Sequence, residues 1–200
     1  MPVTLGEYEG CASNRVDKFI RAVNSFINQS YQNKELVIIS DGCDLTRDVY
    51  LENFNNHNNI LFEKLEKAPV FSGSVRNRGI ALASGDWICY LDSDDFFGHN
   101  HLELLGSQIT ADLDWCFSDD YTVTQYVSSE NFTSSLRENT LACSQIGTSS
   151  IIHKKELNVN WPDGYGHDWE LINTLIQLTC KYTKVAANYN VCHIPGAFDV

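Results

Sequence analysis

Short apolar runs alternate with amphipathic segments through the first 120 residues of the chain. A three-turn apolar period predicts a helix over residues 16–27, with Ser13 or Asn14 available as its N-cap. Beyond it, strands are predicted at 35–40, 60–65, 87–91 and 115–118, and helices at 45–54, 74–83 and 101–109. Continuous apolar strands separated by helices predict an α/β fold, with a mostly parallel sheet flanked by helices.

The second half of the chain has a less regular pattern. Strands are predicted at 121–127 and 147–153, a helix at 168–179, and one or two edge strands at 182–193. The polar segment 128–145 shows no period and is predicted to be a mobile loop. The length of 200 residues suits one domain, with a regular half at about 1–98 and an irregular, partly antiparallel half at about 99–200.

Composition excludes several classes of function. A formal net charge of −12 argues against a nucleic-acid surface and against attraction to anionic lipid. The seven cysteines are odd in number and lack Cys-x-x-Cys spacing, which favours reduced thiols over disulfides or a zinc site. No signal peptide or 18-residue apolar run is visible. We therefore expect a cytoplasmic protein without a transmembrane segment, which other parts or partners could still bring to a membrane.

Three carboxylates follow one predicted strand within four residues. The apolar segment 87–91 leads directly into Asp92, Asp94 and Asp95. Like charges at this spacing repel one another and resist burial, so a divalent cation carrying a phosphorylated ligand is the natural partner. Ligands of parallel sheets bind at the carboxyl ends of the strands, and Asp41 ends another predicted strand.

The acidic segment has two other interpretations. A solvated turn after a core strand is the ordinary explanation of an Asp-rich segment. A calcium loop of EF-hand type is excluded, because Phe96 and Phe97 stand where that loop needs an oxygen ligand and a glycine.

Several blocks of the sequence resemble family 2 glycosyltransferases of the GT-A fold. They are residues 15–44 (RVDKFIRAVNSFINQSYQNKELVIISDGCD), 76–95 (RNRGIALASGDWICYLDSDD), 166–169 (GHDW) and 189–193 (YNVCH). The resemblance implies a Rossmann-like, inverting enzyme of polysaccharide biosynthesis. Such an enzyme moves a sugar from a nucleotide diphosphate to a hydroxyl of a glycan or glycolipid acceptor, and the donor expected here is a UDP-sugar. Residues 1–98 would bind the donor and 99–200 the acceptor.

The resemblance also implies a metal site. Asp94 would hold Mn²⁺ or Mg²⁺ against the leaving diphosphate, and Asp92 would contact the ribose or a metal-bound water. Asp95 would only orient its neighbours. His193 is a further candidate metal ligand, since neutral imidazole suits these ions; a structural role is the alternative.

Three more residues receive roles from the resemblance. Asp168 would be the general base that takes the proton of the acceptor, although an Asp at this point could instead be a helix N-cap. Asp41 would contact the nucleotide base, or else serve only as a turn residue before Gly42. Arg76 would lie near the base or diphosphate, with an exposed helix start as the alternative; Asn77 is expected to stabilise local backbone.

The chain departs from the family pattern at two places. His167 precedes Asp168 where the family has Glu, so the tuning of Asp168 and the choice of acceptor are open. The first strand, at residues 1–5, is short: either it is trimmed, or Met1 lies inside a longer reading frame.

Two further clusters receive the ordinary interpretation. His99 and His101 have His-x-His spacing and could bind metal, but a surface loop leading into a helix is preferred. Asp119 and Asp120 could face the acceptor, but an exposed turn is preferred.

Two other functions remain open on sequence alone. A nucleotidyltransferase would share nucleotide and metal, but residues 6–14 lack the glycine-rich, Lys- or Arg-bearing loop that holds a triphosphate. A non-catalytic module that binds a nucleotide sugar or a glycan is the other alternative.

Overall fold

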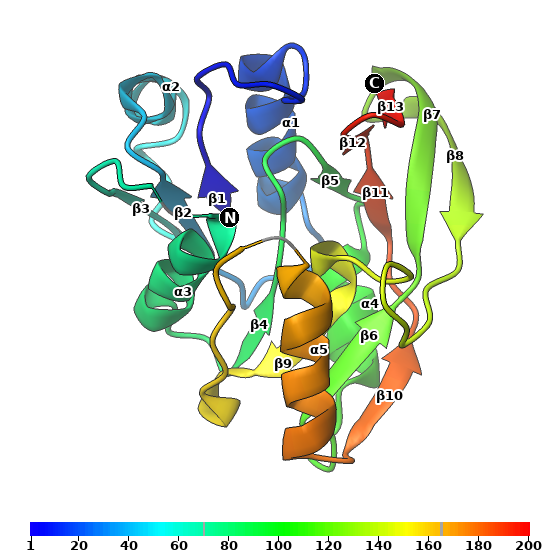
Figure 1. Ribbon diagram of the computed structural model, residues 1–200. Helices are drawn as coiled ribbons and strands as arrows, with labels where there is room; N and C mark the ends of the chain where they lie inside the picture. The colour runs from blue at the N-terminus through cyan, green and yellow to red at the C-terminus, as the bar shows by residue number, and fades with distance from the viewer. Residues whose placement is uncertain (70, 165) are drawn as a thin grey trace.

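The computed structural model describes residues 1–69, 71–164 and 166–200 (Figure 1). Its first sheet is parallel, with the order β1 (Pro2–Val3), β2 (Leu36–Ser40), β3 (Ile60–Lys64). The helices of this part are α1 (Arg15–Ile27), α2 (Asp44–Asn53) and α3 (Ser72–Leu82). These elements confirm the predicted strand–helix alternation to within about two residues at each end.

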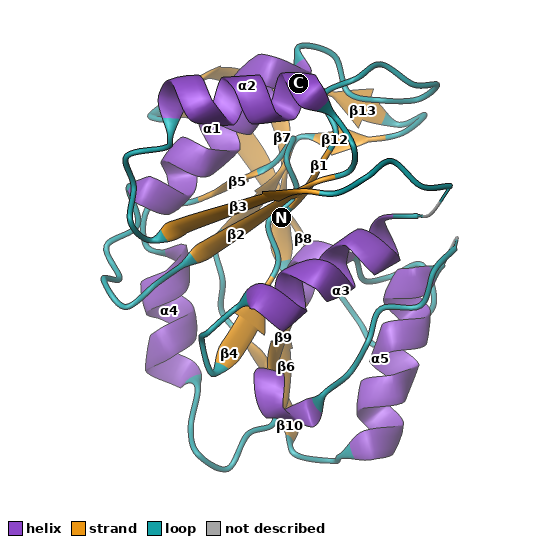
Figure 2. Ribbon diagram, turned by 90° about the vertical axis from the view of Figure 1, so that its left-hand side faces the viewer, coloured by secondary structure: helices purple, strands orange, loops and turns teal. Residues whose placement is uncertain are grey.

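A second sheet continues the fold below the first (Figure 2). Its order is β10 (Tyr182–Val185), β6 (Trp115–Ser118), β9 (Ile151–Lys154), β4 (Trp87–Cys89). β10 runs parallel to β6, whereas β9 runs antiparallel to both β4 and β6. Figure 2 shows α4 (His101–Gln108) on one side of this sheet, and α3 and α5 (His167–Leu178) on the other. The predicted α/β class is confirmed, with β9 interrupting the parallel order.

A third sheet forms the less regular half. Its order is β5 (Phe96–Phe97), β11 (Tyr189–Val191), β7 (Asp120–Ser128), β8 (Asn131–Arg137). Short 3₁₀ turns η1 (Thr148–Ser150) and η2 (Lys155–Leu157) and the strand pair β12 (His193–Ile194) and β13 (Phe198–Asp199) complete the described elements.

Two predictions for this half were wrong. The segment expected to be a mobile loop contains β8, which pairs with β7 in a long hairpin. Phe132 and Leu136 are the only apolar residues of β8, and the strand is largely exposed, so its apolar signal is weak. Of the two strands at 182–193, β10 is an edge strand as predicted, but the edge prediction was wrong for β11, which lies between β5 and β7 with all three of its residues buried.

The core lies on both sides of these sheets. Phe19, Val23 and Phe26 of α1 pack with Ile38 of β2 in one cluster. The other large cluster contains buried residues of β6 and β9 together with Leu171, Ile172 and Leu175 of α5. The apolar stripe of α1 therefore packs against the first sheet, and that of α5 packs against the second sheet.

No helix among the described residues is both long and apolar enough to cross a bilayer.

Two leucines of α5 provide a test of this packing. Leu171 is fully buried, whereas Leu178 is 53% exposed. We expect Leu171→Ala to lower the free energy of unfolding by about 2–5 kcal/mol, because it leaves a cavity. Leu178→Ala should change it by less than about 0.5 kcal/mol. Urea unfolding of both variants measures the difference; equal losses would show that α5 does not pack as described.

Candidate active site

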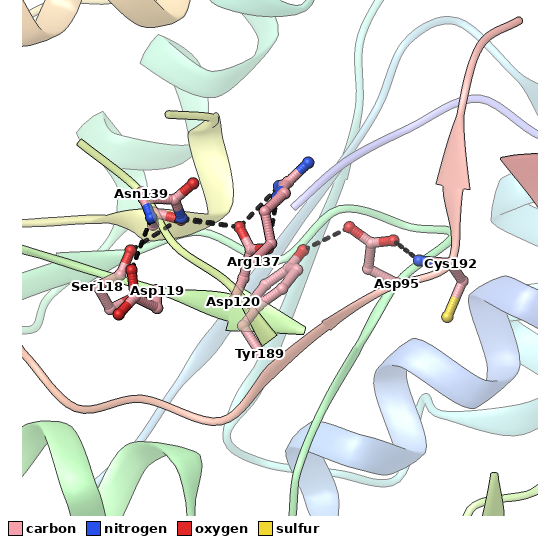
Figure 3. Close-up of polar contacts among 9 residues, drawn as sticks. Asp95, Ser118, Asp119, Asp120, Arg137, Asn139, Tyr189 and Cys192 are labelled. Carbon is pink, nitrogen blue, oxygen red and sulfur yellow. Dashed lines mark hydrogen bonds and ion pairs between the residues drawn. The ribbon is translucent and has the colours of Figure 1, made fainter. Parts of the chain in front are cut away.

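Asp95 is the buried member of the acidic segment after β4. Its carboxylate is 5% exposed and accepts hydrogen bonds from the Tyr189 hydroxyl at 3.0 Å and the Cys192 amide at 2.7 Å (Figure 3). Burial, reinforced by the charges of Asp94 and Asp92, raises the pKa of Asp95 well above its ordinary value. Asp95 therefore connects the acidic segment to β11 and the residue after it, which agrees with an orienting role.

Asp94 lies between its two acidic neighbours and is half-buried. Burial first, and then the charge of Asp92, raises the pKa of Asp94. The Arg21 guanidinium donates to the backbone carbonyl of Asp94 at 2.6 Å, so it fixes the main chain at this point. The carboxylate oxygens suit a hard divalent cation, and such an ion would relieve the repulsion between the two acids.

Asp92 is held by an arginine from α3. Arg76 has a side chain only 6% exposed; it donates to the Asp92 carboxylate at 2.9 Å and to the Ser72 hydroxyl at 2.6 Å. Its guanidinium also lies over the ring of Trp161, 4.9 Å from the centroid. The alternative that Arg76 marks an exposed helix start is wrong. Asn77 exchanges two hydrogen bonds with the backbone of Trp161, which is 84 residues away, so it stabilises distant backbone and not the local backbone as predicted.

His167 joins this arginine to the carboxylate on α5. The His167 Nδ1 lies 2.6 Å from the Gly164 carbonyl, which can only accept, so Nδ1 carries a proton. In the neutral ring, Nε2 then accepts from Arg76 Nη1 at 3.3 Å. The same Nε2 lies 3.6 Å from Asp168 Oδ1. A continuous series of contacts thus connects Asp92 with Asp168.

Asp168 stands in the first turn of α5, with its side chain 34% exposed. The cap position belongs to Gly166, whose φ of 81° is left-handed backbone that favours glycine, so the alternative of Asp168 as N-cap is wrong. The Thr148 hydroxyl donates to the Asp168 carboxylate. A carboxylate in the first turn is also favoured by the helix dipole.

Asp41 directly follows β2 and pairs with Lys67. Gly42 adopts φ 67°, and a Cβ there would lie 2.7 Å from the Lys67 Cα. The turn after β2 therefore requires glycine for steric reasons. Asp41 is not part of the contact series that includes Asp92 and Asp168.

His193 occupies a polar niche near the C-terminus of the chain. Its Nε2 lies 3.1 Å from the Gly10 carbonyl and must donate to it, so the neutral ring bears its lone pair on Nδ1. This buried Nδ1 has no hydrogen-bond partner among the described residues and lies 3.2 Å from Asp199 Oδ1. Although burial opposes the shift, hydrogen bonds from Lys18 and Ser13 lower the pKa of Asp199, which is therefore ionised.

The lone pair on His193 Nδ1 and the neighbouring Asp199 carboxylate together suit a cation, either a proton or a metal ion. In the described part of the chain, no three His, Cys, Asp or Glu side chains are gathered closely enough to hold a metal by themselves. The protein would thus supply only part of a coordination shell, as Mg²⁺ sites that complete their shell with water and phosphate do.

One member of each secondary cluster is buried against its predicted surface position, whereas His99 is exposed just before α4 as predicted. Asp120 is fully buried in β7 and receives two hydrogen bonds of 2.7 Å from Arg137, with further ones from Asn139 and Ser150 (Figure 3). The predicted exposed turn is therefore wrong for Asp120. Its partner Arg137 belongs to β8, the facing strand of the hairpin, and no sequence pattern predicts that pairing.

His101 is buried as well, so the predicted surface loop is wrong there. It stacks on Phe97 with 4.2 Å between ring centroids and accepts from the Asn188 amide at 3.1 Å. Burial lowers the pKa of His101 to about 3. The imidazole is a neutral core residue and not an exposed metal ligand.

Sequence reasoning gave Tyr189 no role, although it belongs to the block 189–193. Its buried hydroxyl accepts from the Asp92 amide at 3.0 Å and donates to Asp95. Nothing in the local sequence around Tyr189 indicates that its hydroxyl connects Asp92 with Asp95.

The known proteins that this chain resembles are glycosyltransferases. The family model for glycosyl transferase family 2 matches residues 11–169. An uncharacterised glycosyltransferase of Rickettsia bellii is 39% identical over 94 residues, which cover 46% of this chain and 13% of that protein. One from Haemophilus influenzae is 37% identical over 90 residues, covering 42% of this chain and 33% of that protein. The match thus spans a third or less of either relative.

Among solved structures, S. aureus TarS in complex with UDP superposes with a TM-score of 0.70 over 90% of this chain and 58% of the TarS chain. The sequence identity is 18%, so this likeness concerns the fold, and it confirms the predicted GT-A architecture.

The buried imidazole of His101 predicts a pH dependence of stability. Its pKa is about 3 in the folded protein and near 6.5 when unfolded, so only the unfolded state takes up this proton between those values. Stability should therefore fall as the pH drops below 6.5, by at most about 1.4 kcal/mol per pH unit from this group. Urea unfolding between pH 7 and 4 should give a shallower slope for His101→Phe than for the wild type; parallel profiles would contradict the assignment.

Proposed function

The chain belongs to glycosyl transferase family 2, and we propose that it transfers a sugar from a nucleotide diphosphate, UDP before others, to an acceptor hydroxyl with inversion. One observation carries the proposal: Arg76 and His167 connect the strand-end carboxylate Asp92 with the half-exposed carboxylate Asp168. Donor-side and base-side groups thus belong to one polar assembly. The TarS structure solved with UDP supports the choice of nucleotide.

Asp168 is proposed as the general base. Single-displacement inversion needs a carboxylate opposite the leaving group to take the proton of the acceptor hydroxyl. The Thr148 hydroxyl orients Asp168, and its exposure leaves an oxygen accessible to an acceptor. His167 stands where the family has Glu and presents a lone pair to Arg76, so Asp168 has an imidazole neighbour and not a second carboxylate.

The donor side is proposed to form around Asp92 and Asp94. Arg76 fixes the Asp92 carboxylate, which would contact the ribose or a metal-bound water. Asp94 would bind Mn²⁺ or Mg²⁺, with His193 Nδ1 as a further ligand. When bound, the ion would neutralise charge that develops on the leaving diphosphate. Asp41 would contact the nucleotide base once its ion pair with Lys67 is broken.

The acceptor is proposed to be a glycan or glycolipid that binds against the half formed by residues 99–200, with a cytoplasmic location for the reaction. A second solved structure, of TarS with UDP-GlcNAc, makes that donor the first to try. A nucleotidyltransferase is disfavoured by the family match, and a non-catalytic binding module is an outcome that the tests below would reveal.

Titration of UDP tests the donor site. In calorimetry, the wild type should bind UDP more tightly with Mn²⁺ than without it. Asp94→Ala should abolish that gain, at least about tenfold in Kd, because the ion loses a carboxylate ligand. Asp48→Ala, on the exposed surface of α2, is the matched control and should behave as wild type. Equal binding by wild type and Asp94→Ala would reject Asp94 as a metal ligand.

Turnover tests the base. With UDP-GlcNAc as the first donor of a panel of UDP-sugars, Asp168→Asn should reduce UDP release by about 10²–10⁴-fold, because asparagine cannot accept the proton. UDP affinity should stay near the wild-type value. If the wild type binds UDP and turns over no donor, the chain is a binding module; if Asp168→Asn retains full turnover, another group is the base.

A further inference from the structure

The imidazole of His167 is held by groups from three segments of the chain. Its Nδ1 donates to the Gly164 carbonyl at 2.6 Å, and its Nε2 lies 3.3 Å from Arg76 Nη1. The ring of Trp161 meets the imidazole edge to face, with 5.5 Å between the centroids and 73° between the planes. The side chain of His167 is only 18% exposed. These contacts direct Nδ1 toward the loop before α5 and Nε2 toward α3.

The lone pair of His167 satisfies a buried donor of Arg76. One N–H of Arg76 Nη1 is used by the Ser72 hydroxyl at 2.6 Å, and Nη2 donates to Asp92 at 2.9 Å. The second N–H of Nη1 has the His167 Nε2 as its acceptor. Because the Arg76 side chain is only 6% exposed, loss of this acceptor leaves a buried donor unpaired. His167 therefore helps to keep the guanidinium on Asp92.

Asp168 is the other neighbour of the same nitrogen, with its Oδ1 3.6 Å from His167 Nε2. The charged side chains that the structure places against the ring are thus Arg76 from α3 and Asp168 from α5, with Asp92 beyond Arg76. The loop before α5 presents a carbonyl and an indole ring to the imidazole. From η1, the uncharged Thr148 hydroxyl donates to Asp168.

A proton on Nε2 would reverse these contacts. The imidazolium has N–H groups on both nitrogens, so it cannot accept from Arg76, and it sets a second positive charge against the guanidinium. The same N–H can donate to Asp168, whose negative charge favours it. Since one nitrogen serves both neighbours, the neutral ring binds Arg76 and the charged ring binds Asp168.

We propose that His167 is a positioning residue of the transfer reaction, active only as the neutral ring protonated on Nδ1. In this state Arg76 stays on Asp92, and the Asp168 carboxylate is free to take the proton of the acceptor hydroxyl. In the imidazolium, the Nε2–H occupies Asp168 and competes with the acceptor for it. The inference rests on the proposed function with Asp168 as base, and it adds a loss of turnover as the imidazole gains its proton.

The test uses three variants of the full chain. His167→Gln keeps an acceptor near the position of Nε2 and takes up no proton. His167→Phe keeps a ring and removes the acceptor. His99→Gln makes the same change at an exposed histidine before α4 and is the matched control. UDP release is followed between about pH 5 and 8, and the ¹⁵N shifts of the imidazoles are recorded without ligand over the same range.

The pH profile separates positioning from a merely structural role. The wild type and His99→Gln should lose kcat at least about tenfold over the pH range in which His167 gains its proton. His167→Gln should keep kcat near the wild-type value at the alkaline end and lose little over that range. His167→Phe should have a lower kcat throughout, because Arg76 loses its acceptor. An acid loss in His167→Gln equal to that of the wild type would overturn the proposal.

The ¹⁵N shifts test the same contacts without turnover. His167 should carry its proton on Nδ1 in the neutral ring. In Asp168→Asn it should titrate at lower pH, by at least about 0.5 unit, because the imidazolium loses its carboxylate partner. A proton on Nε2 of the neutral ring, or an unchanged titration, would contradict the proposal. If both shifts are as expected and the wild type turns over no donor, the transfer reaction is rejected, and the role of His167 in it, while the contacts stand.

Discussion

The buried carboxylate of Asp95 is the interaction on which the candidate site depends. Three acidic residues within four positions would repel one another and open the turn after β4. Asp95 instead accepts from the Tyr189 hydroxyl and the Cys192 amide, and the same hydroxyl accepts from the Asp92 amide. One acid is thus used structurally, and Asp92 and Asp94 are the two left for the proposed donor site. Burial first, and then this crowding of negative charge, raises the pKa of both Asp94 and Asp95.

A second set of contacts connects the two halves of the chain. Arg76 on α3 contacts Asp92 after β4 and His167 on α5, although 91 residues separate it from that histidine. The arginine can be buried because Asp92 offsets its charge and Trp161 covers its face. This geometry gives His167 a role beside the proposed base Asp168, because its Nε2 accepts a hydrogen bond from the Arg76 guanidinium. A glutamate at this position would instead offer Arg76 a second carboxylate.

Local pattern was sufficient for most of the regular half. The apolar stripe of α1, the continuous run of β2 and the acidic end of β4 are signals within a few residues, and each element appears close to its predicted bounds. The pattern failed where burial depends on distant partners. β8 is too exposed to show an apolar period, and Asp120 is buried only because Arg137, Asn139 and Ser150 satisfy its carboxylate.

The sequence by itself determined the α/β class, the family resemblance and the candidate carboxylates, because strand and helix periods and short acidic motifs are local properties of a chain. The tertiary structure decided which carboxylates are structural and which are accessible. It also placed β9 antiparallel within the second sheet, buried Arg76 and oriented His167 toward it. These outcomes depend on hydrogen bonds and charge pairs between segments tens of residues apart, and no local periodicity encodes such pairings.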